Sequence, residues 1–174
     1  MRRTLFTTAI LTSLGMAMPA LAQDSVPTAS ASLKGVDGAE HGTVDLRQTP
    51  NGVLLTLNLK DVPAGVHGFH VHETGKCDPD FKAAGGHFAD GKEHGLTVEG
   101  GPHPGDMPNI HVTDSETLTQ EIFNTYISLD EGDDGYLMDD DGSAILIHAG
   151  ADDYASQPSG DAGDRIACGV IEMR

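Results

Sequence analysis

The 174-residue sequence has no tryptophan, and aromatic residues make up only 5% of it. Basic residues are also scarce, because 10 Lys and Arg stand against 27 Asp and Glu and the formal net charge is −17. Nucleic acids and anionic membrane surfaces both require a basic face, so we expect neither as a partner. A surplus of acid keeps a protein soluble, and it bears on function only where the substrate is itself an anion.

Long apolar segments are missing too, apart from one near the N-terminus. Residues 5–14 are mostly apolar but too few to span a bilayer. They follow the bases Arg2 and Arg3 and precede Ala20-Leu21-Ala22, a small-x-small cleavage site, so the pattern predicts a signal peptide over residues 1–22. A buried N-terminal helix is the alternative. The paired arginines leave the general and the twin-arginine export routes both open.

Cysteine is scarce as well, with only Cys77 and Cys168 in the chain. An exported protein enters an oxidising compartment, where these two thiols can form one internal disulfide; two unrelated buried thiols are the alternative. Residues 23–31 are small and polar and predict a flexible arm, which leaves residues 32–174 for the folded domain.

The rest of the chain consists of short segments of alternating apolar and polar residues, separated by turns rich in the 22 Gly and 9 Pro. Asn51-Gly52 is typical of a two-residue hairpin turn. No long amphipathic helix intervenes, so the sequence predicts an all-β fold, an antiparallel sandwich or barrel of about eight strands. The expected strands cover residues 31–36, 43–46, 53–59, 66–73, 109–113, 118–127, 143–148 and 165–172.

Two long stretches, residues 74–108 and 149–164, lack a strand pattern, and the first is rich in Gly, His and charge. Loops of this length in compact domains are usually functional or disordered. The acidic segment 131–141 does not fit a calcium-binding EF-hand loop, because Leu137 falls at the first ligand position. We interpret that segment as a solvated turn.

Nine histidines are an unusual number for so small an acidic protein. His70 and His72 are two positions apart in an expected strand, so their side chains share one face and lie about 7 Å apart. This placement suits two imidazoles that bind one ion, although a hydrogen-bonded core pair is the alternative. His148 closes the expected strand 143–148 and is a further candidate ligand.

A second group of candidate ligands follows in one Gly-rich loop, and it consists of His87, His94, His103 and Asp106. Three imidazoles and one carboxylate suit a tetrahedral zinc ion. If all four were ordinary surface residues, the length of the loop would have no explanation. The sequence therefore predicts a metal site in the loop 74–108.

Six segments, taken in order, resemble the copper/zinc superoxide dismutases. They are GVHGFHVHE (65–73), AGGHF (84–88), HG (94–95), HPGDMPN (103–109), HAGADD (148–153) and GDAGDRIACGVI (160–171). The resemblance extends from about Leu33 to the end of the chain. The leader and the Pro-Asp-Phe-Lys spacer after Cys77 are similar to the bacterial exported branch, which implies a periplasmic location.

The resemblance implies an eight-stranded antiparallel Greek-key sandwich or barrel with two long active-site loops. It implies that superoxide is converted to dioxygen and hydrogen peroxide by a redox-cycling copper, which is bridged through a histidine to a structural zinc. The implied copper ligands are His70, His72, His87 and His148, and the implied zinc ligands are His87, His94, His103 and Asp106.

The resemblance also assigns roles to residues around the metals. His87 is the bridging ligand and a catalytic residue, and Arg165 is a catalytic residue beside the copper. Asp152 links a copper-ligand histidine to a zinc-ligand histidine. For Arg165, an ion pair with Asp161 or Asp164 is a second possible role, which does not come from the resemblance. The resemblance also implies a disulfide between Cys77 and Cys168 and a structural role for His67. His41 and His111 match no functional position of the family.

The last active-site loop departs from the family because residues 151–164 contain no lysine to guide an anionic substrate. Lys76, Lys82 and Lys92 flank the metal-binding loop and are our candidates for that guidance, with ordinary solvated lysines as the alternative.

Two other functions would use some of the same residues. An exported copper-binding or copper-delivery protein without turnover needs copper ligands, but it needs neither Arg165, Asp152 nor the zinc ligands. A sandwich that had lost its site would lack ligands, and none is missing. The sequence leaves a homodimer and a monomer both open.

Overall fold

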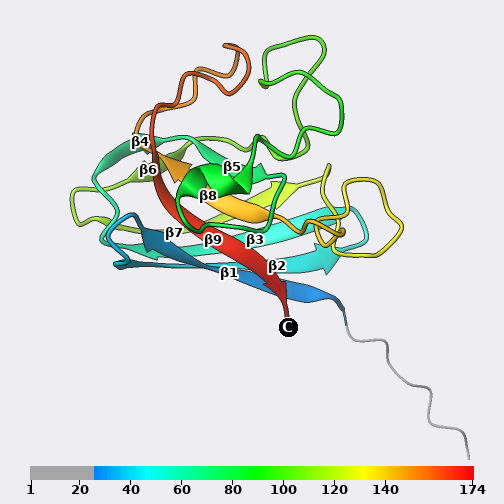
Figure 1. Cartoon of the computed structure of the whole chain (residues 1–174), viewed down its shortest axis with the longest axis horizontal. Helices are drawn as coiled ribbons and strands as arrows, with labels where there is room; N and C mark the ends of the chain where they lie inside the picture. Colours follow the sequence, from blue (N-terminus) through cyan, green and yellow to red (C-terminus); the bar gives the residue numbers. More distant parts are fainter. Residues whose placement is uncertain (1–25) are drawn as a thin grey trace, which may run out of the picture.

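A computed structural model describes residues 26–174, so the predicted signal peptide and the first residues of the predicted arm lie outside the described residues (Figure 1). Every strand pairing is antiparallel, within a seven-stranded sheet of order β5-β8-β9-β1-β2-β3-β7 and a two-stranded sheet β4-β6. The elements among these residues are β1 (Thr28–Gly35), β2 (Glu40–Thr49), β3 (Gly52–Lys60), β4 (Gly65–His67), β5 (Phe69–His72), the 3-10 helix η1 (Phe81–Ala84), β6 (Ile110–Val112), β7 (Thr117–Asn124), β8 (Ala144–His148) and β9 (Arg165–Met173). The predicted all-β sandwich is confirmed.

The core lies inside the curled sheet. In β3, Val53, Leu55, Leu57 and Leu59 are buried, while the residues between them are more exposed, as the two-residue period of a strand requires. One continuous apolar cluster contains these side chains together with Phe69 of β5 and residues of β1, β2, β7, β8 and β9. Strands from both ends of the sheet therefore share one core.

The expected strand 66–73 is divided at Gly68 into β4 and β5, which is why nine strands replace the predicted eight. The Gly68 N–H donates to the Gly150 carbonyl at 2.8 Å, and the Gly68 carbonyl accepts from the His148 N–H at 2.9 Å. A Cβ atom at this position would lie only 2.9 Å from the Ala162 Cβ. Gly68 thus lets the strand that carries His70 and His72 approach the last loop closely.

The predicted arm over residues 23–31 is wrong for residues 28–31, because β1 already begins at Thr28. Ala29 and Ala31 point into the core and are almost fully buried, and this segment pairs with both β2 and β9. Small side chains that look like a flexible arm in the sequence are here the buried face of a central strand.

The two long stretches without a strand pattern are loops, as predicted, and only η1 interrupts the first. The predicted disulfide is present and joins Cys77 in this loop to Cys168 in β9, with a Cα–Cα distance of 5.9 Å. The acidic segment 131–141 is more than a solvated turn, because Leu137 is fully buried and its N–H donates to the Ser128 carbonyl at 3.0 Å. Within residues 26–174, no helix is long and apolar enough to cross a membrane.

The disulfide predicts a large loss of stability on reduction. It closes a loop of 91 residues, and releasing such a loop raises the entropy of the unfolded chain by an amount worth roughly 4 to 5 kcal/mol. We expect the Cys77→Ser/Cys168→Ser variant to unfold at lower urea concentration and to retain metal less well, as measured by equilibrium unfolding and elemental analysis. Two titratable thiols in the freshly purified, unreduced wild-type protein would contradict the prediction.

Candidate metal centre

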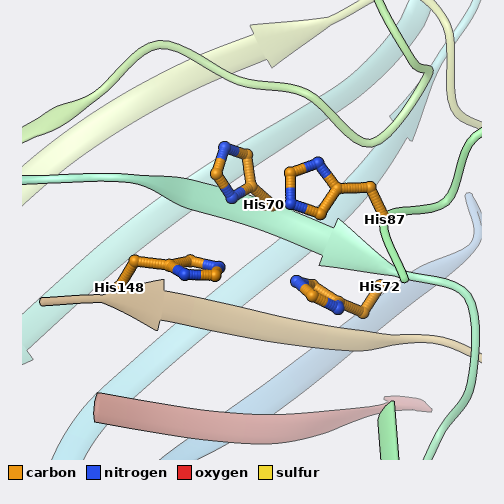
Figure 2. Close-up of side chains that lie close together, drawn as sticks. All are labelled: His70, His72, His87 and His148. Atoms are coloured by element: carbon orange, nitrogen blue, oxygen red, sulfur yellow. The ribbon is translucent and has the colours of Figure 1, made fainter. Parts of the chain in front are cut away.

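Three histidines on neighbouring strands form the centre of the site. His70 and His72 lie on β5, which pairs with β8, and His148 is the last residue of β8. His87 enters from the loop that follows β5, and each of the four residues offers a nitrogen within 4.8 Å of the others. Figure 2 shows the four rings gathered in one space between the strands and the loop.

Each ring in this group uses one nitrogen to fix its position. His72 Nδ1 donates to the Gly85 carbonyl at 3.1 Å, and His148 Nδ1 donates to the Gly163 carbonyl at 3.2 Å. The four other nitrogens are buried and have no hydrogen-bond partner; they are His70 Nδ1, His72 Nε2, His87 Nε2 and His148 Nε2. Buried polar atoms are rarely left unpaired, so four of them facing one another fit a metal ion that accepts their lone pairs.

Burial keeps His70, His72 and His148 neutral, as metal ligands must be. Desolvation lowers the pKa of His70 to about 3 and that of His148 to about 4, against an opposing hydrogen bond in each case. Desolvation likewise holds the pKa of His72 well below its ordinary value. At neutral pH the lone pairs are therefore available without the release of a proton from these rings.

The second group is centred on one carboxylate oxygen. Asp106 Oδ1 lies 2.8 Å from His87 Nδ1, 3.0 Å from His94 Nδ1 and 3.2 Å from His103 Nδ1. A tetrahedral zinc ion with bonds of 2.0–2.1 Å places its ligand atoms about 3.3 Å apart. The donor atoms and their spacing therefore fit zinc.

Asp106 is held in place as an anion. Its Oδ2 accepts from the backbone N–H groups of Gly95 at 2.9 Å and His103 at 3.0 Å. Burial alone would raise the pKa of this carboxyl, but hydrogen bonds from His87 and Gly95 and the neighbouring histidines lower it overall.

His87 belongs to both groups. Its Nδ1 faces Asp106, and its buried Nε2 faces His70, His72 and His148. A single imidazole with each nitrogen in a different ligand group could therefore serve as a ligand to an ion in each group.

Asp152 connects the two groups from the opposite side. Its Oδ2 lies 2.9 Å from His70 Nε2, and its Oδ1 lies 3.0 Å from His94 Nε2. Gly160 makes room for this contact, because a Cβ atom there would overlap Asp152 Oδ1 and lie 2.7 Å from His94 Nε2. The carboxylate fixes one ring of each group in a single orientation.

Arg165, at the start of β9, is held beside the first group by backbone carbonyls. Its two terminal nitrogens donate to the Phe81 and Gly85 carbonyls, each at 2.6 Å. Among residues 26–174, Arg165 has no ion pair with Asp161 or Asp164, so the second role considered for it is not seen. A cavity of about 440 Å³ reaches the surface here and is lined by Arg165, His72, His87 and His148, among others.

The structure therefore brings every predicted ligand into one of two adjoining groups. His67 is structural, as predicted, because its ring bonds to the His148 and Pro63 carbonyls at 2.8 Å each. Sequence reasoning missed the loop residues that join the two long loops, namely Asn109, Tyr154 and Gln157. Polar residues in loops carry no periodic pattern, so no feature of the sequence could pair them.

The fold and the site together define a class, an all-β sandwich with two metal sites that share one histidine. A family model described as copper/zinc superoxide dismutase (SODC) matches residues 40–171. The chain belongs to the copper/zinc superoxide dismutase family, as the sequence motifs led us to expect.

Relatives and solved structures agree with this assignment. Superoxide dismutase (Cu-Zn) 1 of Aquifex aeolicus is 46% identical over 138 residues, covering 78% of this chain and 82% of the relative. Superoxide dismutase (Cu-Zn) of Caulobacter vibrioides is 45% identical over 149 residues, covering 83% and 86%. The crystal structure of a SOD-like protein from Bacillus subtilis superposes with a TM-score of 0.78 at 34% identity, covering 81% of this chain and 96% of that one.

The buried histidines predict that the metal-free protein loses stability on mild acidification. Each is neutral in the folded state, whereas the unfolded chain takes up a proton below its ordinary pKa of 6.5. Their contribution to stability is complete above that pH and is lost as the pH falls towards the folded value, which is about 4 at His148. From pH 7 to pH 5 we expect a loss of about 2 kcal/mol in the free energy of unfolding for each such histidine.

Urea unfolding of the metal-free protein at the two pH values checks this expectation. The His148→Gln variant should lose about 2 kcal/mol less than the wild type over the same interval. The His111→Gln variant, altered on the exposed side of β6, is the matched control and should behave as the wild type does. Equal wild-type stability at pH 7 and pH 5 would contradict the prediction.

Proposed function

We propose that this protein dismutates superoxide, with copper bound by His70, His72, His87 and His148 and zinc bound by His87, His94, His103 and Asp106. The observation that carries the proposal is the four buried, unpartnered imidazole nitrogens, which adjoin a second group centred on Asp106 and share His87 with it. Two superoxide ions and two protons yield one dioxygen and one hydrogen peroxide. When bound, copper supplies the one-electron redox couple and zinc supplies a fixed charge without redox chemistry.

The protein's own residues bind the anion and handle protons. The fixed guanidinium of Arg165 lines the same cavity as the histidines and provides N–H donors and a permanent positive charge for a small anion. His87 Nε2 also faces the copper group and is the atom that takes up a proton and passes it to the reduced substrate. His87 Nδ1, which belongs to the second group and would bind zinc there, would hold the ring in place while the proton moves.

Burial and orientation favour turnover over simple copper delivery. The copper-group histidines are almost fully buried, whereas a carrier must release its ion to a partner. Arg165, Asp152 and the zinc group have no use in a carrier, yet all are assembled here. Superoxide loss measured before and after copper loading separates the two functions.

We further propose that residues 1–22 are a signal peptide and that the domain acts in the periplasm. The disulfide supports this location, because such bonds persist in oxidising compartments. The leader supports it through its paired bases, short apolar segment and small-x-small site.

The metal assignment predicts which ion each substitution removes. The protein purified from the periplasm should begin at Gln23 and hold one copper and one zinc. His94→Ala should weaken zinc binding by more than about 100-fold, because losing a ligand costs more than losing an outer partner. His148→Ala should deplete copper and abolish turnover, by elemental analysis and a superoxide assay.

Substitution of an exposed histidine provides the control. His111→Ala should keep both metals and full activity, since the side chain lies outside both ligand groups. Zinc that survived the loss of both His94 and Asp106 would refute the assignment, and a mature protein that retained residues 1–22 would refute the signal peptide.

If lysines guide the anionic substrate to the site, kcat/KM should depend on Lys76, Lys82 and Lys92, which are all exposed. Lys82 lines a cavity of about 760 Å³ together with Arg165, Asp80 and Asp164, so it places a second positive charge near the fixed guanidinium and beside two acids. Replacing the three lysines with Gln should lower kcat/KM by about two- to tenfold and flatten its decline with added salt, because steering is screened by ions. Pulse radiolysis at several ionic strengths measures both effects.

The control is a variant that loses the same number of positive charges at positions away from the site. A variant with Gln at Arg47, Lys60 and Arg174 should keep a kcat/KM close to that of the wild type, since net charge alone does not set the local field. Arg165→Gln should cost more than the triple lysine variant, because Arg165 also positions the bound anion. Unchanged kcat/KM and salt dependence in the triple lysine variant would exclude these lysines from guidance.

A further inference from the structure

Glu73 follows the candidate ligand His72 at the end of β5 and leads into the first long loop, and the proposed mechanism does not use it. It lies opposite Gly86, the residue before His87. The Glu73 N–H donates to the Gly86 carbonyl at 3.0 Å, and Glu73 Oε1 accepts from the Gly86 N–H at 2.8 Å. The backbone and the side chain of one residue therefore hold both polar backbone groups of Gly86.

The peptide unit between Gly85 and Gly86 is where this contact meets the site. Its N–H is the one that donates to Glu73, and its carbonyl is that of Gly85. The carbonyl accepts from His72 Nδ1 at 3.1 Å and from a terminal nitrogen of Arg165 at 2.6 Å. A planar trans peptide unit directs its N–H and its C=O in opposite directions. A carboxylate that fixes the N–H therefore also fixes the direction in which the carbonyl meets His72 and Arg165.

This peptide unit needs a restraint, because glycine flanks it on both sides and glycine allows the widest range of backbone angles. Gly85 has a φ of 73° and a ψ of −152°, a combination that is essentially restricted to glycine. A Cβ atom at Gly85 would lie only 2.6 Å from Glu73 Oε1, so the carboxylate packs directly against this backbone. Hydrogen bonds to an ionised acceptor are also stronger than those between neutral groups. Glu73 thus supplies the restraint that two adjacent glycines lack.

We propose that Glu73 is a positioning residue for the anion-binding guanidinium. Its carboxylate locks the Gly85–Gly86 peptide unit, and the locked carbonyl holds Arg165 in its orientation beside the histidines. The proposal rests on the proposed function for copper in the first ligand group and for Arg165 as the group that binds the anion. Glu73 also lines the cavity of about 440 Å³ together with Arg165, where its negative charge opposes the entry of an anion. One side chain therefore combines a favourable acceptor with an unfavourable charge.

The variants Glu73→Gln and Glu73→Leu separate the acceptor from the charge. Both lack the negative charge, but only glutamine keeps an oxygen that can accept from the Gly86 N–H. Azide, a small anion, is titrated against the copper- and zinc-loaded protein and followed by its absorption band on copper. The azide Kd should be about three- to tenfold higher in Glu73→Leu than in Glu73→Gln, because a displaced guanidinium no longer aligns its donors with the anion. The Kd of Glu73→Gln should equal or lie below that of the wild type, since the opposing charge is gone.

Glu121, on the exposed face of β7, provides the matched control. The variants Glu121→Gln and Glu121→Leu should both bind azide as the wild type does. Equal azide Kd values in Glu73→Leu and Glu73→Gln would overturn the proposal, because the acceptor would then have no effect on the site.

Crystal structures of the loaded Glu73 variants give a readout that does not depend on azide. In Glu73→Leu, the Gly85 carbonyl should move out of hydrogen-bond distance of Arg165. In Glu73→Gln, the 2.6 Å contact between these two groups should remain. A Gly85 carbonyl that stayed on Arg165 in the leucine variant would overturn the proposal.

The two proposals fail in different ways. If the copper-loaded wild type did not dismutate superoxide, the proposed function would be wrong, and the crystal structures would still decide whether Glu73 holds the peptide unit. If the wild type were active but the glutamine and leucine variants shared one azide Kd and one peptide orientation, the positioning role of Glu73 alone would be wrong.

Discussion

Burial of imidazole nitrogens that have no protein partner is the constraint on which this structure depends. Four such atoms face one another in the group formed by His70, His72, His87 and His148, and each unpaired buried polar atom costs about 1 to 3 kcal/mol. Burial of apolar side chains in the continuous core inside the curled sheet must offset that cost. The second nitrogen of each ring is held by a carbonyl or a carboxylate, so the rings cannot rotate to relieve the cost. A metal ion relieves it instead, which links metal affinity directly to folding.

Two carboxylates organise the rest of the site, and they do so differently. Asp106 offers one oxygen to three rings and uses the other to accept two backbone N–H groups, so it is itself fixed by the loop that carries it. Asp152 divides its oxygens between His70 and His94, so it belongs to neither group alone. A displacement at either metal group therefore reaches the other through Asp152 as well as through His87.

Much of the fold and the ligand groups could be predicted from the sequence, for different physical reasons. The two-residue period of a strand places His70 and His72 on one face, and the turn signal in residues 49–52 marks the β2–β3 hairpin, in which Pro50 and Asn51 lie between the paired residues Thr49 and Gly52. His94, His103 and Asp106 lie in a loop without a period, so donor type and loop length grouped them with His87, and the resemblance to family motifs supplied their individual roles. The break at Gly68 and the early start of β1 depend on contacts with distant segments, the last loop and β9. The same is true of Gln157 and Tyr154, whose partners are more than 40 positions away.

The Gly85 carbonyl accepts hydrogen bonds from both His72 and Arg165, and the Phe81 carbonyl holds the other side of the guanidinium. Both carbonyls lie in the short segment that the bond between Cys77 and Cys168 ties to β9, the strand that begins with Arg165. The thiol–disulfide balance of the surroundings should therefore affect the orientation of the Arg165 guanidinium, our proposed anion-binding group, as well as the stability of the chain. In a reducing compartment the same sequence would hold both its metals and its substrate site less firmly. The orientation of the guanidinium in this molecule thus depends in part on the oxidation state of one pair of sulfur atoms.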